Sequence, residues 1–333
     1  MSETHRRQFL IASGVFLVAP RVHCQGASKV RRVGLLSAVD AVTFEPYLDA
    51  FREALRDRGW VEGKNIVIEV RYAEGNQTRM PEMARDLVNR GVEILLPGTT
   101  PGVAAALGAN PGGPIVMTAT IDAHLSGFVE DLSRPGGNVT GLTQVSLDLM
   151  DKRLSLLKEA IPSITRLGYL HPGMGTNPQV VKVMDAAMRA IETAARRLGI
   201  ELQAISAVGA DQIEAAFARF AAARVHAIYA LEGSLGSHRV LIASLALKSR
   251  LPTMFGSPTF VEAGGLMSYG ADLLDLYRRA ATYVDKILKG AKAGDLPVEQ
   301  PTRYELVVNV KTAQALGLTL SPAFLMRVNR RID

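Results

Sequence analysis

The order of hydrophobic and polar positions in the first half of the chain alternates between two periods. Short aliphatic runs, as at 33–36 and 66–70, are followed by stretches in which apolar residues recur every three or four positions. The first pattern predicts strands and the second predicts amphipathic helices. Further strands are expected at 93–96 and 115–117, and helices at 44–55, 80–88 and 103–107. Strands that alternate with helices are typical of a parallel sheet with crossover helices.

The same alternation starts again after a segment that interrupts it. Arg134–Gly141 is too rich in glycine and proline to continue a helix or a strand. Beyond it, helices are predicted at 147–160, 179–198, 213–223, 238–249 and 273–288, and strands at 166–170, 201–205, 227–231 and 253–255. A chain of 333 residues exceeds what one core usually organises. We therefore predict an α/β protein of two doubly wound lobes that hinge around a cleft.

Residues 1–27 are expected to be an export signal instead of part of either lobe. The pair Arg6-Arg7 precedes an apolar run from Leu10 to Ala19. A charged start before such a run is typical of a secretory signal, and paired arginines indicate the twin-arginine pathway. The alternatives are a membrane anchor or a buried helix. A spanning helix needs about 20 apolar residues, and Pro20 ends this run sooner, so the working protein is expected in the periplasm.

Composition and charge exclude several kinds of site. Cys24 is the one cysteine, so a mature chain beginning after it has no disulfide, thiolate metal site or cysteine nucleophile. Lipid attachment at Cys24 is not expected, because Arg21-Val22-His23 differs from the small apolar residues that lipidation requires. The six histidines contain no pair at helical metal-binding spacing, so neither a metal nor another cofactor is expected. The net charge of +6 is spread along the chain, which predicts no nucleic-acid partner.

The residues directly after each strand of the first lobe are candidates for a binding site, because open α/β sheets bind ligands beyond the carboxyl ends of their strands. These residues are Ser37, Thr99, Thr100 and Asp122. Thr99 and Thr100 precede Pro101 at a helix start, where hydroxyls, free N–H groups and the helix dipole favour a carboxylate. The alternative is a plain capping turn. Asp122 suits an ammonium or hydroxyl group, or it caps the helix expected after it.

The second lobe offers Glu232, Asn177 and Tyr269 as further candidates. Glu232 follows a predicted strand and supplies a second carboxylate for an amine or hydroxyl, unless it is a solvated loop residue. Asn177 and Tyr269 are placed to close over a ligand from two sides, although a tyrosine at a strand end often only packs. His171, before Pro172, is interpreted as a loop residue instead of a base.

The sequence contains few signatures of enzymes. It contains no Gly-x-Ser-x-Gly elbow, no Walker loop and no Gly-x-Gly-x-x-Gly, and Ser37 to Asp40 stands where the dinucleotide motif would follow the first strand. We therefore predict a binding protein with no catalytic residues. The alternative is a cleft enzyme that uses Asp122 and Glu232 as acid and base.

Longer motifs carry a resemblance to a known family. They are Thr259–Gly270, Arg278–Gly290, Asp295–Thr302, Glu305–Leu318, Gly59–Ile66 and Ser133–Gly141. From about Arg32 to Leu325 the chain resembles the substrate-binding proteins of ABC transporters, in the family that includes tryptophan- and tyrosine-binding members. Where relatives carry Asp-Pro-Val-Gly, this chain has Asp122-Ala-His-Leu-Ser-Gly127, a departure that changes the cleft wall.

The resemblance implies a type I periplasmic-binding-protein fold with three crossings between the lobes, near Thr140, Gly265 and Gly294. The N-terminal lobe would hold residues 30–142 plus 266–293, and the C-terminal lobe residues 143–265 plus 294–333. The implied function is an exported receptor, expected as a monomer, that closes around one small carboxylate-bearing, amino-acid-like solute and delivers it to a membrane permease. A ligand sensor for a signalling partner is the second alternative.

Overall fold

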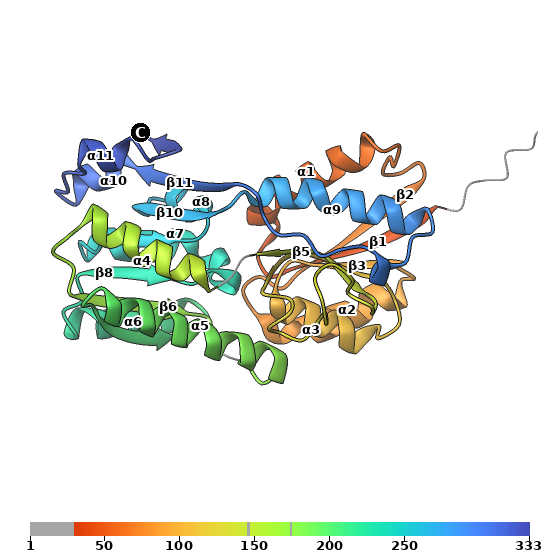
Figure 1. Cartoon of the computed structure of the whole chain (residues 1–333), viewed down its shortest axis with the longest axis horizontal. Coiled ribbons are helices and arrows are strands. Elements are labelled where there is room, and N and C mark those ends of the chain that lie inside the picture. The colour runs from red at the N-terminus through yellow and green to blue at the C-terminus, as the bar shows by residue number, and fades with distance from the viewer. Residues whose placement is uncertain (1–29, 145–146, 174) are drawn as a thin grey trace, which may run out of the picture.

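The chain folds into two α/β lobes that lie side by side (Figure 1). The computed structural model describes residues 30–144, 147–173 and 175–333. The predicted export signal, with Cys24, lies outside these residues. Both lobes have sheets covered by helices on two faces, so the predicted α/β class and the doubly wound plan are confirmed.

The first lobe is built on a parallel five-stranded sheet with the strand order β2-β1-β3-β4-β5. Its strands are β1 (Arg31–Ser37), β2 (Ile66–Tyr72), β3 (Ile94–Pro97), β4 (Ile115–Ile121) and β5 (Val139–Gln144). One face is covered by α1 (Ala41–Arg56) and α9 (Leu273–Leu288), the other by α2 (Met80–Asn89) and α3 (Thr100–Ala109). Each face buries its own apolar cluster, because strands of a parallel sheet are hydrophobic on both sides.

The second lobe contains a seven-stranded sheet in the order β12-β11-β10-β9-β8-β6-β7, with an antiparallel pair at β10 and β11. Its strands are β6 (Arg166–His171), β7 (Glu201–Ser206), β8 (Ala227–Ala230), β9 (Thr253–Phe255), β10 (Met267–Ala271), β11 (Tyr304–Asn309) and β12 (Arg330–Ile332). Its helices are α4 (Asp148–Ala160), α5 (Pro178–Arg197), α6 (Ala210–Ala222), α7 (Arg239–Lys248), α8 (Pro258–Glu262), α10 (Val310–Ala315) and α11 (Pro322–Leu325). The order β7-β6-β8-β9-β10 repeats the order of the first lobe.

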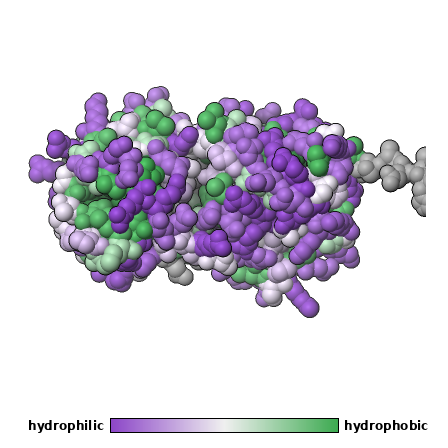
Figure 2. All heavy atoms as spheres, turned by 90° about the horizontal axis from the view of Figure 1, so that it is seen from above, coloured by the Kyte–Doolittle hydropathy of each residue, from purple (hydrophilic) through white to green (hydrophobic). Residues whose placement is uncertain are grey.

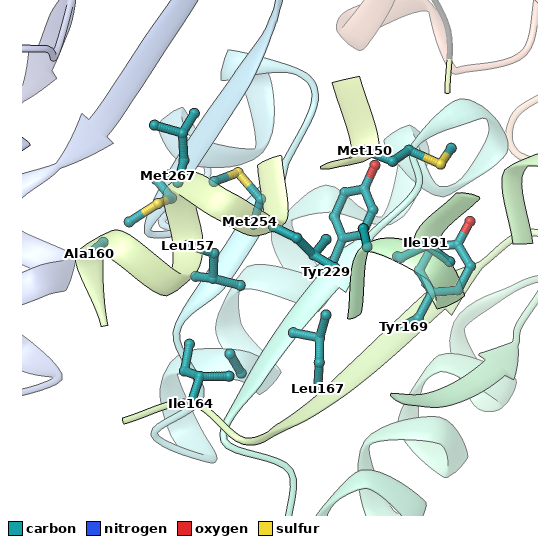
Figure 3. Close-up of a cluster of buried hydrophobic side chains, with 14 of the residues drawn as sticks. Met150, Leu157, Ala160, Ile164, Leu167, Tyr169, Ile191, Tyr229, Met254 and Met267 are labelled. Atoms are coloured by element: carbon teal, nitrogen blue, oxygen red, sulfur yellow. The ribbon is translucent and has the colours of Figure 1, made fainter. Parts of the chain in front are cut away.

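One core of the second lobe is shown in Figure 3, where side chains of α4 and α5 meet those of β6, β8 and β9. Tyr169 and Tyr229 stack in it with their ring centroids 5.5 Å apart, and their hydroxyls point the same way. Leu157 and Leu167 are buried beside them. A fully buried leucine contributes about 1.5–3 kcal/mol to folding, so these contacts stabilise the second-lobe wall of the cleft.

The segments that cross between the lobes correct the predicted boundaries. β10 belongs to the seven-stranded sheet, so residues 266–271 lie in the second lobe, and the crossing to α9 falls at Asp272 instead of near Gly265. β5 keeps residues 143–144 in the first lobe. Residues 294–299 also bond to that lobe, since the Glu299 N–H donates to the Gly141 carbonyl at 2.9 Å. Gly265 and Gly294, near which crossings were predicted, therefore lie within the lobes and not at the crossings themselves.

The surface seen from above is largely hydrophilic, with smaller hydrophobic areas on both lobes (Figure 2). Three short 3-10 helices complete the described chain, at Gln77–Arg79, Gly233–His238 and Ala293–Asp295. Within the described ranges, no helix has both the length and the apolar character needed to cross a membrane.

Candidate ligand-binding site

A cavity of about 180 Å³ lies between the two lobes and is lined by residues of both. The ends of β1, β3 and β4 reach it from the first lobe, and the loops after β6, β8 and β9 reach it from the second. Carboxyl ends of parallel strands are where ligands bind in such sheets. A space of this size between two lobes suits one small molecule.

The first-lobe wall presents a cluster of aromatic rings. Tyr47 of α1 stacks on Tyr277 of α9 with centroids 5.4 Å apart and an interplanar angle of 28°. Phe44 meets Tyr277 edge-on, also at 5.4 Å. Burial raises the pKa of both tyrosines, so their hydroxyls stay protonated and can donate hydrogen bonds. Such a wall suits the flat apolar part of a ligand.

The second-lobe wall carries two charged side chains. Arg153 of α4 is only 6 % exposed; its Nε donates to the Tyr269 carbonyl at 2.6 Å and its Nη1 to the Tyr229 hydroxyl at 2.9 Å. Burial lowers the pKa of Arg153, but Tyr229 and Glu232 more than offset this, and the guanidinium remains charged. Glu232, which follows β8, accepts a hydrogen bond from the Gly256 N–H.

These two charges are neighbours in an otherwise uncharged cavity and form no direct ion pair. Among the lining residues that the structure describes, Arg153 is the one cation and Glu232 the one anion, and no ion pair joins them. Gly256 leaves room between them, because a Cβ there would lie less than 3.0 Å from both Arg153 Nη2 and Glu232 Oε1. The wall therefore offers one positive and one negative group to a ligand.

Contacts between the lobes close the cleft on one side. The Asp40 N–H donates to the Ser237 hydroxyl at 3.2 Å, and Arg239 Nη1 donates to the Thr43 hydroxyl. The Asp40 carboxylate in turn accepts from the Thr43 N–H at 2.9 Å and caps α1. Burial raises the pKa of Asp40, but the hydrogen bonds from Thr43 outweigh this and hold it below its ordinary value. The start of α1 and the start of α7 thus meet across the cleft.

Four of the seven residues predicted from the sequence line the cavity: Ser37, Thr99, Thr100 and Glu232. The Thr99 hydroxyl accepts from the Gly102 N–H and the Thr100 hydroxyl from the Ile121 N–H, each at 3.3 Å. Thr99 therefore caps α3, as the alternative interpretation had it, while both hydroxyl protons remain to donate to a ligand. The Ser37 hydroxyl already donates to a backbone carbonyl two residues on.

The other three predicted residues, Asp122, Asn177 and Tyr269, do not line this cavity. The Asp122 carboxylate accepts from the Leu125 N–H at 2.9 Å and stabilises a turn in which Asp122 has a φ of +35°. Asn177 caps α5 through two backbone N–H groups. The Tyr269 ring stacks on Tyr304 at 6.1 Å. The polar groups of Asp122 and Asn177 serve local structure, which sequence spacing does not distinguish from a binding role.

His171 differs from its predicted place in a loop. It ends β6 and is buried, and its ring stacks on Tyr169 at 5.2 Å while Nδ1 accepts from the Gly173 N–H. Burial lowers the pKa of His171 and favours the neutral ring. Within the described residues, no group of three or more His, Cys, Asp or Glu is arranged to hold a metal.

Sequence reasoning missed Arg153 and the three aromatic residues of the first-lobe wall. Arg153 stands three residues after Met150 and four before Leu157, so it lies on the apolar face of α4, where an arginine is unusual. The position of this arginine could therefore have been recognised as unusual from the sequence. Phe44 and Tyr47 belonged to a helical stripe that predicted only core packing.

Comparisons with known proteins agree with this architecture. The tyrosine-binding protein of Clostridioides difficile (strain R20291) is 23% identical over 293 residues, which cover 88% of this chain and 82% of that protein. A conserved domain protein of Vibrio cholerae is 27% identical with a TM-score of 0.82, covering 91% of this chain and 100% of the other. The ABC domain of Streptococcus pneumonia in complex with L-Trp is 24% identical with a TM-score of 0.81, covering 91% and 99%.

The family model for ABC transporter substrate binding proteins matches residues 32–332, nearly the whole of the described chain. The match spans both lobes and every residue of the cavity wall discussed above. The chain therefore belongs to the family of ABC transporter substrate binding proteins, as its motifs and its two-lobed fold indicate.

Proposed function

We propose that this protein is the exported solute-binding component of an ABC importer, and that it captures a small carboxylate-bearing, amino-acid-like ligand between its lobes. The observation that carries the proposal is the cavity itself, which both lobes wall and which combines aromatic rings with few polar groups. Sites for small ligands are largely apolar with a small number of placed polar groups. The tyrosine-binding relative and the L-Trp complex support an amino acid as ligand.

Closure of the two lobes around the ligand is the proposed mode of capture. The Asp40–Ser237 and Arg239–Thr43 contacts bridge the cleft, as expected of a closed form. The chain has a TM-score of 0.62 to a ligand-free, open substrate binding protein of Clostridium difficile, at 22% identity and 91% coverage of this chain, against 0.81 to the L-Trp complex. A ligand that contacts both walls favours the closed form by its differential affinity.

Delivery to a membrane permease follows from this role. The two lobes in the closed form present a single surface that the open form lacks, so a permease is able to select loaded receptors. The predicted signal at residues 1–27 would place the protein in the periplasm, where such receptors meet their solutes. Ser37, Thr99, Thr100 and Glu232 remain the proposed polar contacts from the sequence prediction.

The rival interpretation, an enzyme using Asp122 and Glu232 as acid and base, loses its geometric support. Glu232 lines the cavity and Asp122 does not. Two groups that act on one substrate must both reach it.

The test is thermal unfolding of the protein against a panel of the twenty amino acids and related aromatic acids, followed by chemical analysis of the ligand. A ligand that binds only the folded state raises the melting temperature. One saturable ligand recovered unchanged supports the receptor. Conversion of the ligand would support an enzyme, and silence of all twenty amino acids would refute the amino-acid proposal.

A further inference from the structure

We propose that Arg153 and Glu232 together hold the charged head group of an α-amino acid, with the carboxylate on Arg153 and the ammonium on Glu232. The side chain of the ligand then points to the aromatic wall of the first lobe. This inference rests on the proposed function and goes further, because it names the ligand as a zwitterion and assigns its two charges to side chains of one lobe.

The setting of Arg153 fits a carboxylate anchor. Its Nε and Nη1 are held by the Tyr269 carbonyl and the Tyr229 hydroxyl, which fix the plane of the guanidinium. Nη2 has no hydrogen-bond partner among the described residues, and Arg153 lines the cavity. A guanidinium with its plane fixed and one nitrogen without a partner is suited to a charge-assisted hydrogen bond with a carboxylate.

Glu232 offers the complementary half of the site. Its Oε1 accepts the Gly256 N–H, which fixes the carboxylate, while Oε2 makes no hydrogen bond to any described residue. A carboxylate oxygen without a donor in a narrow cavity is suited to an ammonium group.

The electrostatics favour a ligand with both charges. A charge shielded from water is costly unless it is paired. Arg153 and Glu232 already attract each other beside Gly256 but form no direct ion pair, so each keeps hydrogen-bonding capacity for a ligand. A zwitterion that spans the two compensates both. A monocarboxylate or a monoamine adds a net charge to the pair and forms a charge-assisted hydrogen bond with only one of the two groups. Neutral hydroxyls such as those of Thr99 and Thr100 add hydrogen bonds but cannot supply the missing charge.

The space between the two groups is kept by Gly256. A side chain there would collide with Arg153 Nη2 and Glu232 Oε1 together. The backbone of the loop after β9 therefore lies against both charged groups, with Arg153 Nη2 and Glu232 Oε1 among the atoms nearest to it.

The experiment compares three ligands that differ only in the head group. L-tyrosine carries both charges, tyramine lacks the carboxylate and 3-(4-hydroxyphenyl)propionate lacks the ammonium; a matching tryptophan set is run beside them. Binding to the full chain is measured by calorimetry for the wild type, Arg153→Met, Arg153→Lys and Glu232→Gln. The melting temperature of each unliganded variant shows that it is folded, and Arg153→Lys keeps the charge if the methionine variant does not fold.

The expected result is a crossed pattern. The wild type prefers the amino acid to either analogue by roughly 30-fold or more, because each analogue forms a charge-assisted hydrogen bond with only one of the two groups. In Arg153→Met the preference over tyramine falls to about threefold or less, while the preference over the propionate persists. Glu232→Gln shows the reverse. Arg153→Lys reduces the preference over tyramine because it loses the planar fork.

Two results would overturn the inference and are distinguishable. If the wild type binds L-amino acids and the variants keep its preferences unchanged, the head group lies elsewhere and the proposed function stands. If the wild type binds none of the twenty amino acids, the proposed function fails and this inference fails with it.

Discussion

Replacing Arg239 by alanine tests whether contacts between the lobes hold the closed form. Arg239 begins α7, and its Nη1 donates to the Thr43 hydroxyl across the cleft. A hydrogen bond from a charged donor contributes about 1.5–3 kcal/mol. Arg239 is half-buried, so solvent screening favours the lower end, about 1.5 kcal/mol. That corresponds to roughly a tenfold shift of the equilibrium toward the open form.

Because the ligand contacts both walls, a shift toward the open form reduces its apparent affinity. We expect the Kd of the amino acid identified by the panel to rise about tenfold in Arg239→Ala. Calorimetry measures the affinity, and small-angle scattering measures whether the unliganded variant becomes more extended. Arg189→Ala, which removes an exposed arginine on the outer face of α5, is the matched control and should bind as the wild type does.

Two outcomes would refute this reasoning. A Kd within about twofold of the wild type would mean that the contact contributes under about 0.5 kcal/mol, as an ordinary surface pair does. Such a contact would not hold the lobes closed. A fall in the melting temperature of the unliganded variant, large enough to account for the lost affinity, would mean that Arg239 stabilises the lobe and not the closure.

Three further predictions concern backbone, pH and the cavity. Gly141→Ala should lower the free energy of unfolding by about 2 kcal/mol or more, because Gly141 has a φ of +117° and a Cβ there would approach the Met117 backbone within 3.0 Å; an unchanged urea midpoint would contradict this. His171 should titrate below its ordinary pKa of 6.5 by NMR, and since the unfolded chain then binds the proton first, the stability should decrease as the pH falls below that value; a flat profile in His171→Phe is the check. Gly256→Ala should weaken amino-acid binding about tenfold by crowding Arg153, and calorimetry showing equal affinity would argue against that.

Most of the fold could be predicted from periodicity because each lobe is built from local patterns. The strands near residues 33, 66, 94 and 115 lie as expected, and so do the helices α4, α5 and α9. β5, β10, β11 and β12 were not predicted. β5 overlaps the glycine- and proline-rich segment 134–141, and the other three strands have no sign of their own beyond a short apolar run. The crossing at Asp272 also had no local mark, since a lobe boundary depends on which sheet a strand joins.

About half of the residues proposed for the candidate site could be predicted from the sequence. The rule about strand ends located Thr99, Thr100 and Glu232 on the cavity wall. It also selected Asp122 and Asn177, which cap a turn and a helix. Residues that bind small polar ligands are the same types that cap backbone groups, so the sequence alone does not separate them.

The sequence by itself determined the α/β class, the repeated doubly wound plan and the family, because alternating periods and long motifs are local properties that survive without coordinates. Only the tertiary structure decided which side chains share the cavity. Arg153 comes from α4, Glu232 from the loop after β8 and Tyr277 from α9, and they line one cavity because two sheets and three crossings bring distant segments together. That packing determines which groups a charged side chain contacts and which of its hydrogen-bonding atoms have no partner. The proposed zwitterion site therefore depends on tertiary packing and on no single motif.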